Sequence, residues 1–351
     1  MANDFLGVQD AKLATYAILS AEAATELQTR PITGVKVLDF GQGDCNAVVT
    51  DQGKPVVLFD MGGGKHTGSR THPWHTAWNA HGCRAKVLDV SLKPTVVLSH
   101  WDGDHYSTGW YITNSANLTT KVVPVTAPVK DLQWLVPRQC KHPSKLEFVA
   151  QLTNVRCWPG GSHRFNLNAT TDLVVEACSG STSSEYDPNL DGLAVRIDRV
   201  KAGGDPVVDS DVIARIVLPG DAPYQFIPSC KSGPPTKVVG MLAFHHGSET
   251  HLDADAIAAM PVAMANATIG YTFGLKPDGS RCYGHPSKAA IAEYEKGTKG
   301  WTAKVCPSGG FAAWPPEPGD PSTQHNSRGD QTLTLPPAPV RQPISLRRKK
   351  V

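Results

Sequence analysis

The sequence has 351 residues, of which 40% are hydrophobic and 19% charged. This composition is typical of a globular protein and excludes an intrinsically disordered chain. No apolar run approaches the roughly 20 residues that span a bilayer, so the sequence predicts a soluble protein without a membrane partner. Residues 1–27 lack the basic start and apolar block of a secretory signal, and we therefore expect a cytoplasmic location.

Charge and cysteine content further narrow the classes of protein to which this sequence can belong. The net charge of +2 is unevenly spread, because the segment from Glu317 onward holds six Lys or Arg against three Asp or Glu. The rest of the chain is close to neutral and predicts no basic surface for long duplex nucleic acid. The eight cysteines include no Cys-x-x-Cys pair, which is typical of reduced, buried thiols.

The predicted elements, taken in chain order, indicate an α/β protein. Apolar residues at helical spacing predict an amphipathic helix over 11–27, ahead of the core. Short β-branched runs then predict strands, with few helices between them, which implies two packed sheets covered by helices. The predicted strands span 35–40, 46–50, 55–59, 95–99, 121–125, 172–177, 193–197, 212–218, 238–244 and 267–271, and the helices 74–81, 145–152, 253–260 and 287–296.

These elements divide the chain into three predicted parts. Residues 1–31 form a helical N-terminal extension, and residues 32–315 form one large domain. Residues 316–351 are rich in Pro, poor in apolar blocks and end in Arg-Arg-Lys-Lys, so they predict a disordered tail. This tail can be a solubilising end or a contact for phosphate backbones.

Four side chains of metal-binding type follow one apolar strand within six residues. The strand 95–99 is followed by His100, Asp102, Asp104 and His105. Imidazole and carboxylate together are the ligands of zinc, manganese and iron in hydrolytic sites. By itself this spacing is equally typical of a polar loop with surface carboxylates.

Other predicted strands end in residues of the same kinds, which favours a metal site over a polar loop. A site built at one rim of two packed sheets requires ligands at several strand ends. The segments concerned are Asp39 to Asp44, Asp60-Met61-Gly62, Gly220-Asp221 and His245-His246-Gly247-Ser248.

Together these segments resemble the metallo-β-lactamase superfamily, and most closely the soluble hydrolase domain of ComEC-like DNA-uptake competence proteins. The resemblance spans roughly residues 34–312 and implies an αββα sandwich of two mixed sheets flanked by helices. The matching segments are 39–44 (DFGQGD), 59–62 (FDMG), 99–105 (SHWDGDH), 220–221 (GD), 245–248 (HHGS) and 283–286 (YGHP).

The resemblance implies two divalent ions, Zn²⁺ or Mn²⁺, that share a bridging Asp221. His100 and Asp102 would hold one ion, and the remaining ligands the other. His245 is favoured over His246 because it closes the apolar strand, but His246 stays open as the alternative. The full implied ligand set is His100, Asp102, Asp104, His105, Asp221 and His245.

The implied activity is a metal-dependent hydrolase, most readily a phosphodiesterase or nuclease that uses a metal-bound hydroxide. Its partner would be a phosphodiester or nucleic-acid substrate. The alternatives are hydrolysis of a small ester, thioester or amide at the same site, or a non-catalytic metal-dependent binding module. The residues expected in catalysis are Asp104, His246 and His285, the last either a proton donor or simply a loop residue. Asp60 would orient the ligand turn or merely form a turn of its own.

The sequence departs from the family pattern at two places. Asp102 stands where lactamase-type members have His. Those members also carry a further His before the bridging Asp, and here only His142 and His163 lie between His105 and Asp221. His163 follows Gly-Gly-Ser, which predicts an exposed hairpin turn. Gly192 stands where the ComEC-like pattern has Ser after an Asn, here Asn189, so a hydroxyl contact to substrate is not expected there.

Overall fold

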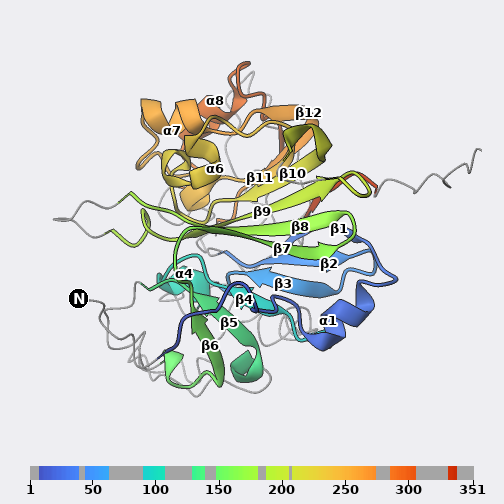
Figure 1. Cartoon of the computed structure of the whole chain (residues 1–351). Helices are drawn as coiled ribbons and strands as arrows, with labels where there is room; N and C mark the ends of the chain where they lie inside the picture. Colours follow the sequence, from blue (N-terminus) through green and yellow to red (C-terminus); the bar gives the residue numbers. More distant parts are fainter. Residues whose placement is uncertain are drawn as a thin grey trace, which may run out of the picture.

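The computed structural model describes residues 8–38, 44–62, 90–106, 129–138, 148–180, 187–204, 208–273, 285–305 and 331–337. Two seven-stranded sheets stack face to face, and helices lie outside the stack (Figure 1). Among the described residues each sheet has three antiparallel and three parallel strand pairs. The predicted sandwich of two mixed sheets is therefore confirmed.

The strands follow each other in the two sheets almost in chain order. The first sheet has the order β14-β1-β2-β3-β4-β5-β6 and the second β13-β12-β11-β10-β9-β8-β7. The first contains β1 (Ile32–Val37), β2 (Asn46–Thr50), β3 (Pro55–Phe59), β4 (Thr95–Val97), β5 (Gln133–Val136), β6 (Asn154–Cys157) and β14 (Gln331–Thr334). The second contains β7 (Ser162–Asn168), β8 (Thr171–Ala177), β9 (Leu193–Val200), β10 (Val212–Leu218), β11 (Val238–Leu242), β12 (Ala263–Gly270) and β13 (Ala303–Val305).

Alternation along the strands fills one apolar layer between the sheets and one on each outer face. On β3, Val57 and Phe59 pack between the sheets, whereas Leu58 packs on the outer face of the first sheet. On β10, Ile216 packs between the sheets and Val217 on the outer face of the second. Successive side chains of a strand point to opposite faces, so these apolar runs suit strands buried on both sides.

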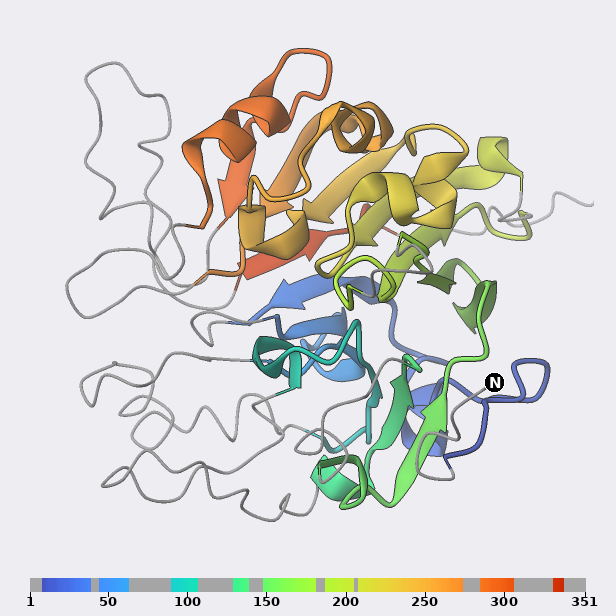
Figure 2. The ribbon, with the colours of Figure 1, turned by 90° about the vertical axis from the view of Figure 1, so that its left-hand side faces the viewer.

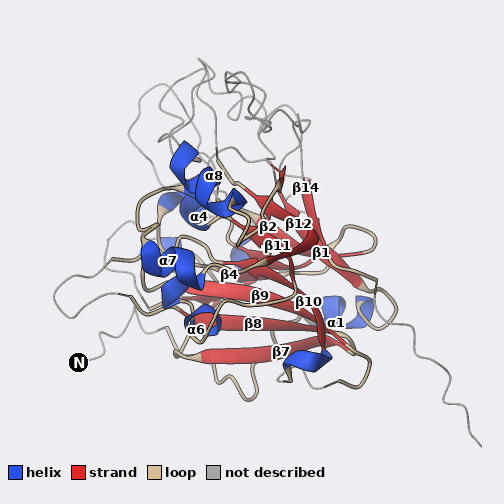
Figure 3. Ribbon diagram, turned by 90° about the horizontal axis from the view of Figure 1, so that it is seen from above, coloured by secondary structure: helices blue, strands red, loops and turns tan. Residues whose placement is uncertain are grey.

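Three short helices cover the outer face of the second sheet, α6 (Pro228–Lys231), α7 (Ala254–Ala259) and α8 (Lys288–Glu295). Figure 3 shows them over the strands. The side chains of Asp253 and Ser287 cap α7 and α8 by accepting backbone N–H groups at 2.8 and 3.0 Å, which confirms two predicted helices. No helix in the described part of the chain is long and apolar enough to cross a membrane.

The N-terminal segment is less helical than predicted. Only α1 (Ala21–Glu26) is an α-helix, so the prediction for 11–20 is wrong. Residues 9–11 pair with Cys157 at the edge of β6. The Thr95 hydroxyl donates to the Ile18 carbonyl, and Gln133 donates to the Ala17 carbonyl. These hydrogen bonds tie residues 17–18 to the first sheet in a non-helical conformation, so α1 does not extend toward the N-terminus.

The C-terminal segment contains a strand where disorder was predicted. β14 pairs antiparallel with β1 and buries Leu333 between the sheets, beside the blue strand in Figure 2. Gly34 and Gly240 make room for it, since a Cβ at Gly34 would overlap the Leu333 carbonyl and one at Gly240 would lie 3.0 Å from the Leu333 side chain. The disorder prediction is wrong for residues 331–334, while 316–330 and 338–351 lie outside the described residues.

Four further strands were missed, namely β5, β6, β7 and β13. His163 lies on β7 with its ring packed on Phe165 at a centroid distance of 4.7 Å, so the hairpin-turn prediction is wrong for it. The predicted strand 121–125, the predicted helix 74–81 and His142 lie outside the described residues.

Candidate metal centre

The predicted ligands gather at one rim of the sandwich, where several strands end. Asp60 directly follows β3, and His100 follows β4, its parallel neighbour. Asp221 follows β10, and the His245-His246 pair follows the parallel strand β11. Parallel strands deliver their C-terminal ends to the same edge, so residues far apart in sequence meet there.

The ligand turn after β4 is held from behind by Asp60. Its φ of 63° is a left-handed conformation, which directs the carboxylate back toward the turn. One oxygen accepts the backbone N–H of Ser99 at 2.6 Å, and the other lies 2.9 Å from His105 Nδ1. The Ser99 hydroxyl lies 3.0 Å from His100 Nδ1 and 3.1 Å from His105 Nδ1. With both Nδ1 atoms engaged, each imidazole presents Nε2 to the centre.

The turn after β11 has an unusual backbone. His245, His246 and Gly247 all have positive φ, of 47°, 56° and 83°. Left-handed conformations at non-glycine residues cost about 1–2 kcal/mol each and gather at functional sites. The turn is fixed by the His245 N–H, which donates to the Gly220 carbonyl at 3.1 Å. This brings both imidazoles to Asp221.

Asp221 divides the donors into two groups, one at each carboxylate oxygen. His105 Nε2 and His246 Nε2 lie 3.3 and 3.9 Å from Oδ1. Asp104 completes this group, with an oxygen 3.5 Å from His246 Nε2. We define Asp104, His105, His246 and Asp221 Oδ1 as the inner group.

The second group forms around the other oxygen of the same carboxylate. His100 Nε2 and His245 Nε2 lie 3.5 and 3.7 Å from Asp221 Oδ2. An oxygen of Asp102 lies 3.8 Å from His100 Nε2. We define His100, Asp102, His245 and Asp221 Oδ2 as the outer group, because its side chains at Asp102 and His245 are 32% and 22% exposed.

The donor atoms fit a metal ion better than they fit one another. Buried polar atoms are normally hydrogen-bonded, yet Nε2 of His100, His105 and His246 and Oδ1 of Asp221 have no hydrogen-bond partner among the described residues. Ligands about 2.0–2.1 Å from a tetrahedral ion lie about 3.4 Å apart. The separations of 3.3–3.9 Å are close to that value and exceed good hydrogen bonds.

The surrounding charge also calls for a cation. Asp44, Asp60 and Asp221 are each at most 4% exposed and form ion pairs only with histidines in the described part of the chain. Buried carboxylates without a compensating charge are strongly destabilising. Divalent ions bound to the two groups would supply that charge.

The pKa shifts of the buried histidines and of Asp221 reflect how closely carboxylates and imidazoles are packed at this site. Burial alone would lower the pKa of His105, but the carboxylates of Asp221 and Asp60 outweigh it and raise the pKa well above its usual value. Burial likewise opposes the rise at His246, where Asp221 and Asp104 raise the pKa to about 9. Burial would raise the pKa of Asp221, but His105 and the other histidines hold it well below its usual value. The centre attracts positive charge.

His285 lies over both members of the His245-His246 pair. Its ring is 5.5 Å from that of His245 and stacks on that of His246 at 6.5 Å. The following residue positions it, because Pro286 packs closely against Gly247 and the Ser287 N–H donates to the Gly247 carbonyl. His285 therefore lies next to the His245-His246 pair at the candidate metal centre.

The structure therefore brings together all six predicted metal ligands and the other two predicted catalytic residues. One detail differs from the expectation. His246, not His245, lies beside Asp104 and His105, while His245 lies with His100. The left-handed turn is the physical reason, since it rotates His246 inward and leaves it 1% exposed.

Three contributors near the site were missed or underrated. Thr272, just after β12, places its hydroxyl 3.1 Å from His246 Nδ1. No role of its own was predicted for Asp44, which belongs to the motif segment 39–44, although its carboxylate is buried beside two histidines. Gly192 proves to be a packing residue, because a Cβ there would lie 2.8 Å from the Ser99 carbonyl. Only the Gly-Asp pattern gave a hint of Asp44 in the sequence.

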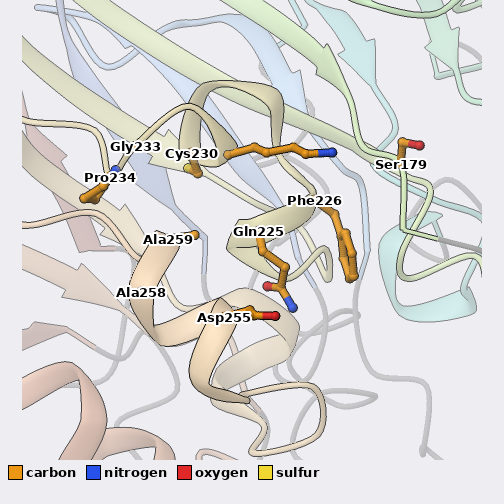
Figure 4. A pocket seen from close by; sticks show the side chains of 10 residues that line it. Ser179, Gln225, Phe226, Cys230, Gly233, Pro234, Asp255, Ala258 and Ala259 are labelled. Atoms are coloured by element: carbon orange, nitrogen blue, oxygen red, sulfur yellow. The ribbon is translucent and has the colours of Figure 1, made fainter.

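A separate pocket of about 470 Å³ lies on the outer face of the second sheet (Figure 4). It lies between η4 (Tyr224–Phe226), α6 and α7, and Gln225, Phe226 and Asp255 are among its lining residues. None of the metal-group residues lines it, so it is distinct from the candidate metal centre.

No family model and no curated protein matches the sequence. Among solved structures, one similar protein is from Parabacteroides distasonis ATCC 8503 and is provisionally named a metal-dependent hydrolase. It is 10% identical, with a TM-score of 0.37 over 79% of this chain and 94% of that protein. Zinc-bound PqqB from Methylobacterium extorquens is also 10% identical, with a TM-score of 0.35 over 78% and 97%. Likeness of this degree does not establish a family.

Proposed function

We propose that this chain is a metal-dependent hydrolase that acts on phosphodiesters with two divalent ions, Zn²⁺ or Mn²⁺. The observation that carries the proposal is the division at Asp221, each of whose oxygens faces a different set of buried or half-buried donors. A single structural ion would need only one such set. Two adjacent sets with a shared carboxylate are typical of two-metal hydrolases.

Two bound ions supply Lewis acidity and lower the pKa of water from about 15.7 toward 7. The protein side chains have separate tasks. Asp60 and Ser99 orient His105 and His100, and Asp221 fixes the spacing of the two groups. We assign His285 the delivery of a proton to the leaving oxygen, since its ring lies next to both adjacent histidine rings at the centre.

The choice of phosphodiester rests on chemistry and on the resemblance in sequence. A pair of ions can stabilise both the attacking and the leaving oxygen of a phosphoryl centre, which a single ion cannot do equally well. The motifs shared with ComEC-like hydrolase domains favour the same substrate class. Hydrolysis of a small ester, thioester or amide needs only one polarised carbonyl, and a binding module needs no proton donor.

A substrate panel tests the proposal. Metal-stripped protein is reloaded with Mn²⁺ or Zn²⁺ and assayed on a chromogenic phosphodiester, single-stranded DNA, RNA and a thioester. We expect metal-dependent turnover of the phosphodiesters and its loss in His100→Ala. Turnover of the thioester alone would support the carbonyl hydrolase, and metal binding without any turnover would support the binding module.

A further inference from the structure

Asp44 is a buried carboxylate with an unmet hydrogen-bonding capacity. It lies just before β2, is 2% exposed, and its Oδ1 has no hydrogen-bond partner among the described residues. A buried acceptor without a partner costs about 1–3 kcal/mol, and more when charged. A buried carboxylate oxygen of this kind calls for an explanation.

The carboxylate of Asp44 lies behind two histidines of the inner group, one from each sheet. Its Oδ1 is 3.7 Å from His246 Nδ1, and its Oδ2 is 4.0 Å from His105 Nδ1. Its backbone joins the same assembly, since the Asp44 N–H donates to the Asp104 carbonyl at 3.1 Å and its carbonyl accepts from Gly62 at 2.7 Å. Asp44 is therefore held in place independently of its side chain.

The chemistry of a metal-bound imidazole explains why a carboxylate lies there. A neutral histidine that gives Nε2 to a metal keeps its proton on Nδ1, and that N–H needs an acceptor. For His105 the acceptor is Asp60, at 2.9 Å. For His246 the groups at Nδ1 are the Thr272 hydroxyl at 3.1 Å and the Asp44 carboxylate. A carboxylate raises the basicity of the ligand, and a hydroxyl does so far less.

We propose that Asp44 is a positioning residue that supports His246, and more weakly His105, as ligands of the inner group. Its charge couples a histidine of the first sheet to one of the second across the sandwich. The inference rests on the metal site of the proposed function. It assigns Asp44 to the retention of metal by the inner group and gives it no contact with substrate.

Zn²⁺ titrations of the full-length protein test this role. The wild type, Asp44→Asn and Thr272→Val are stripped with a chelator and titrated against a competing metal indicator. The matched control is Asp172→Asn, a buried carboxylate on β8 that pairs with Arg164 far along the second sheet. The Tm of each metal-free protein reports the fold separately.

We expect Asp44→Asn to bind one of two Zn²⁺ equivalents about 10–100-fold more weakly, as loss of a carboxylate behind a ligand histidine does elsewhere. Asp172→Asn should bind both Zn²⁺ equivalents with wild-type affinity. Thr272→Val should lose less Zn²⁺ affinity than Asp44→Asn, because the Asp44 carboxylate remains. Wild-type affinity for both equivalents in Asp44→Asn overturns the inference.

The remaining outcomes are also decisive. If Asp44→Asn does not fold, the Zn²⁺ affinity of Thr272→Val decides. A loss of affinity of 100-fold or more would make the Thr272 hydroxyl the sole support of His246 and would reject the role of Asp44. A smaller loss of affinity would support that role. A wild type that binds no Zn²⁺ contradicts the proposed function itself. The two failures are thus distinguishable.

Discussion

Replacement of Asp221 by Asn should remove both metal ions at once. Asp221 is the one described side chain with an oxygen in each donor group, at 3.3–3.9 Å from four histidine nitrogens. An amide keeps the size of the side chain but not its charge or its second ligand oxygen. By contrast, His245→Ala removes a ligand only from the outer group.

The expected increase in Tm follows from the thermodynamic linkage between metal binding and folding. An ion at 100 times its Kd stabilises the folded state by about 2.7 kcal/mol. At about 2 °C per kcal/mol for a large domain, each ion raises the Tm by about 5 °C, and two ions by about 10 °C. Asp221→Asn should show almost none of this increase, and His245→Ala about half.

The metal-free proteins need a separate comparison. The histidines hold the pKa of Asp221 well below its usual value despite burial, so the carboxylate stabilises the metal-free fold above its unfolded pKa and loses this effect in acid. Asp221→Asn should therefore start from a lower Tm at pH 7. The diagnostic quantity is the increase on adding Zn²⁺, measured by calorimetry beside elemental analysis. Wild-type metal content in Asp221→Asn would refute the reasoning.

Three further predictions follow from the outer group, the proton donor and the C-terminal strand. Asp102→His should shift activation from Mn²⁺ toward Zn²⁺ in metal titrations of activity, because it exchanges an oxygen ligand for nitrogen, and an unchanged preference would count against the outer group. His285→Ala should lower turnover about 10²–10⁴-fold for an alkyl leaving group but little for nitrophenolate, with metal content unchanged, and equal losses for both would remove its role. Leu333→Ala should lower the free energy of unfolding, measured in urea, by about 2–5 kcal/mol. Truncation after Pro337 should leave the urea midpoint unchanged. A wild-type midpoint for Leu333→Ala would show that β14 is dispensable for stability.

The rim of the site could be predicted from sequence because its signals are local. Several β-branched runs end next to ligand-type residues, and together with the spacing of His100, Asp102 and His105 they indicate a metal site. The choice between His245 and His246 could not be made in this way. It depends on two consecutive left-handed residues, and a pattern of alternation assumes extended backbone.

The errors at the chain ends have a different origin. Residues 11–20 have helical spacing, but this segment is bound to the first sheet instead. The side chains of Thr95 and Gln133 donate hydrogen bonds to the carbonyls of residues 18 and 17. Residues 331–334 sit in a segment whose composition predicts disorder, and pairing with β1 overrides that composition. Contacts between residues 77 to 300 positions apart leave no local pattern in the sequence.

The pairing of β14 with β1 also bears on how the chain folds during synthesis. Gly34 lies opposite Thr334, so the partner of the first strand is made 300 residues after it. At about 5–20 residues per second, that interval lasts roughly 15–60 s on the ribosome. Throughout it, β1 presents an unpaired edge that other chains can join. We therefore expect the edge of β1 to be open to other chains until β14 has emerged.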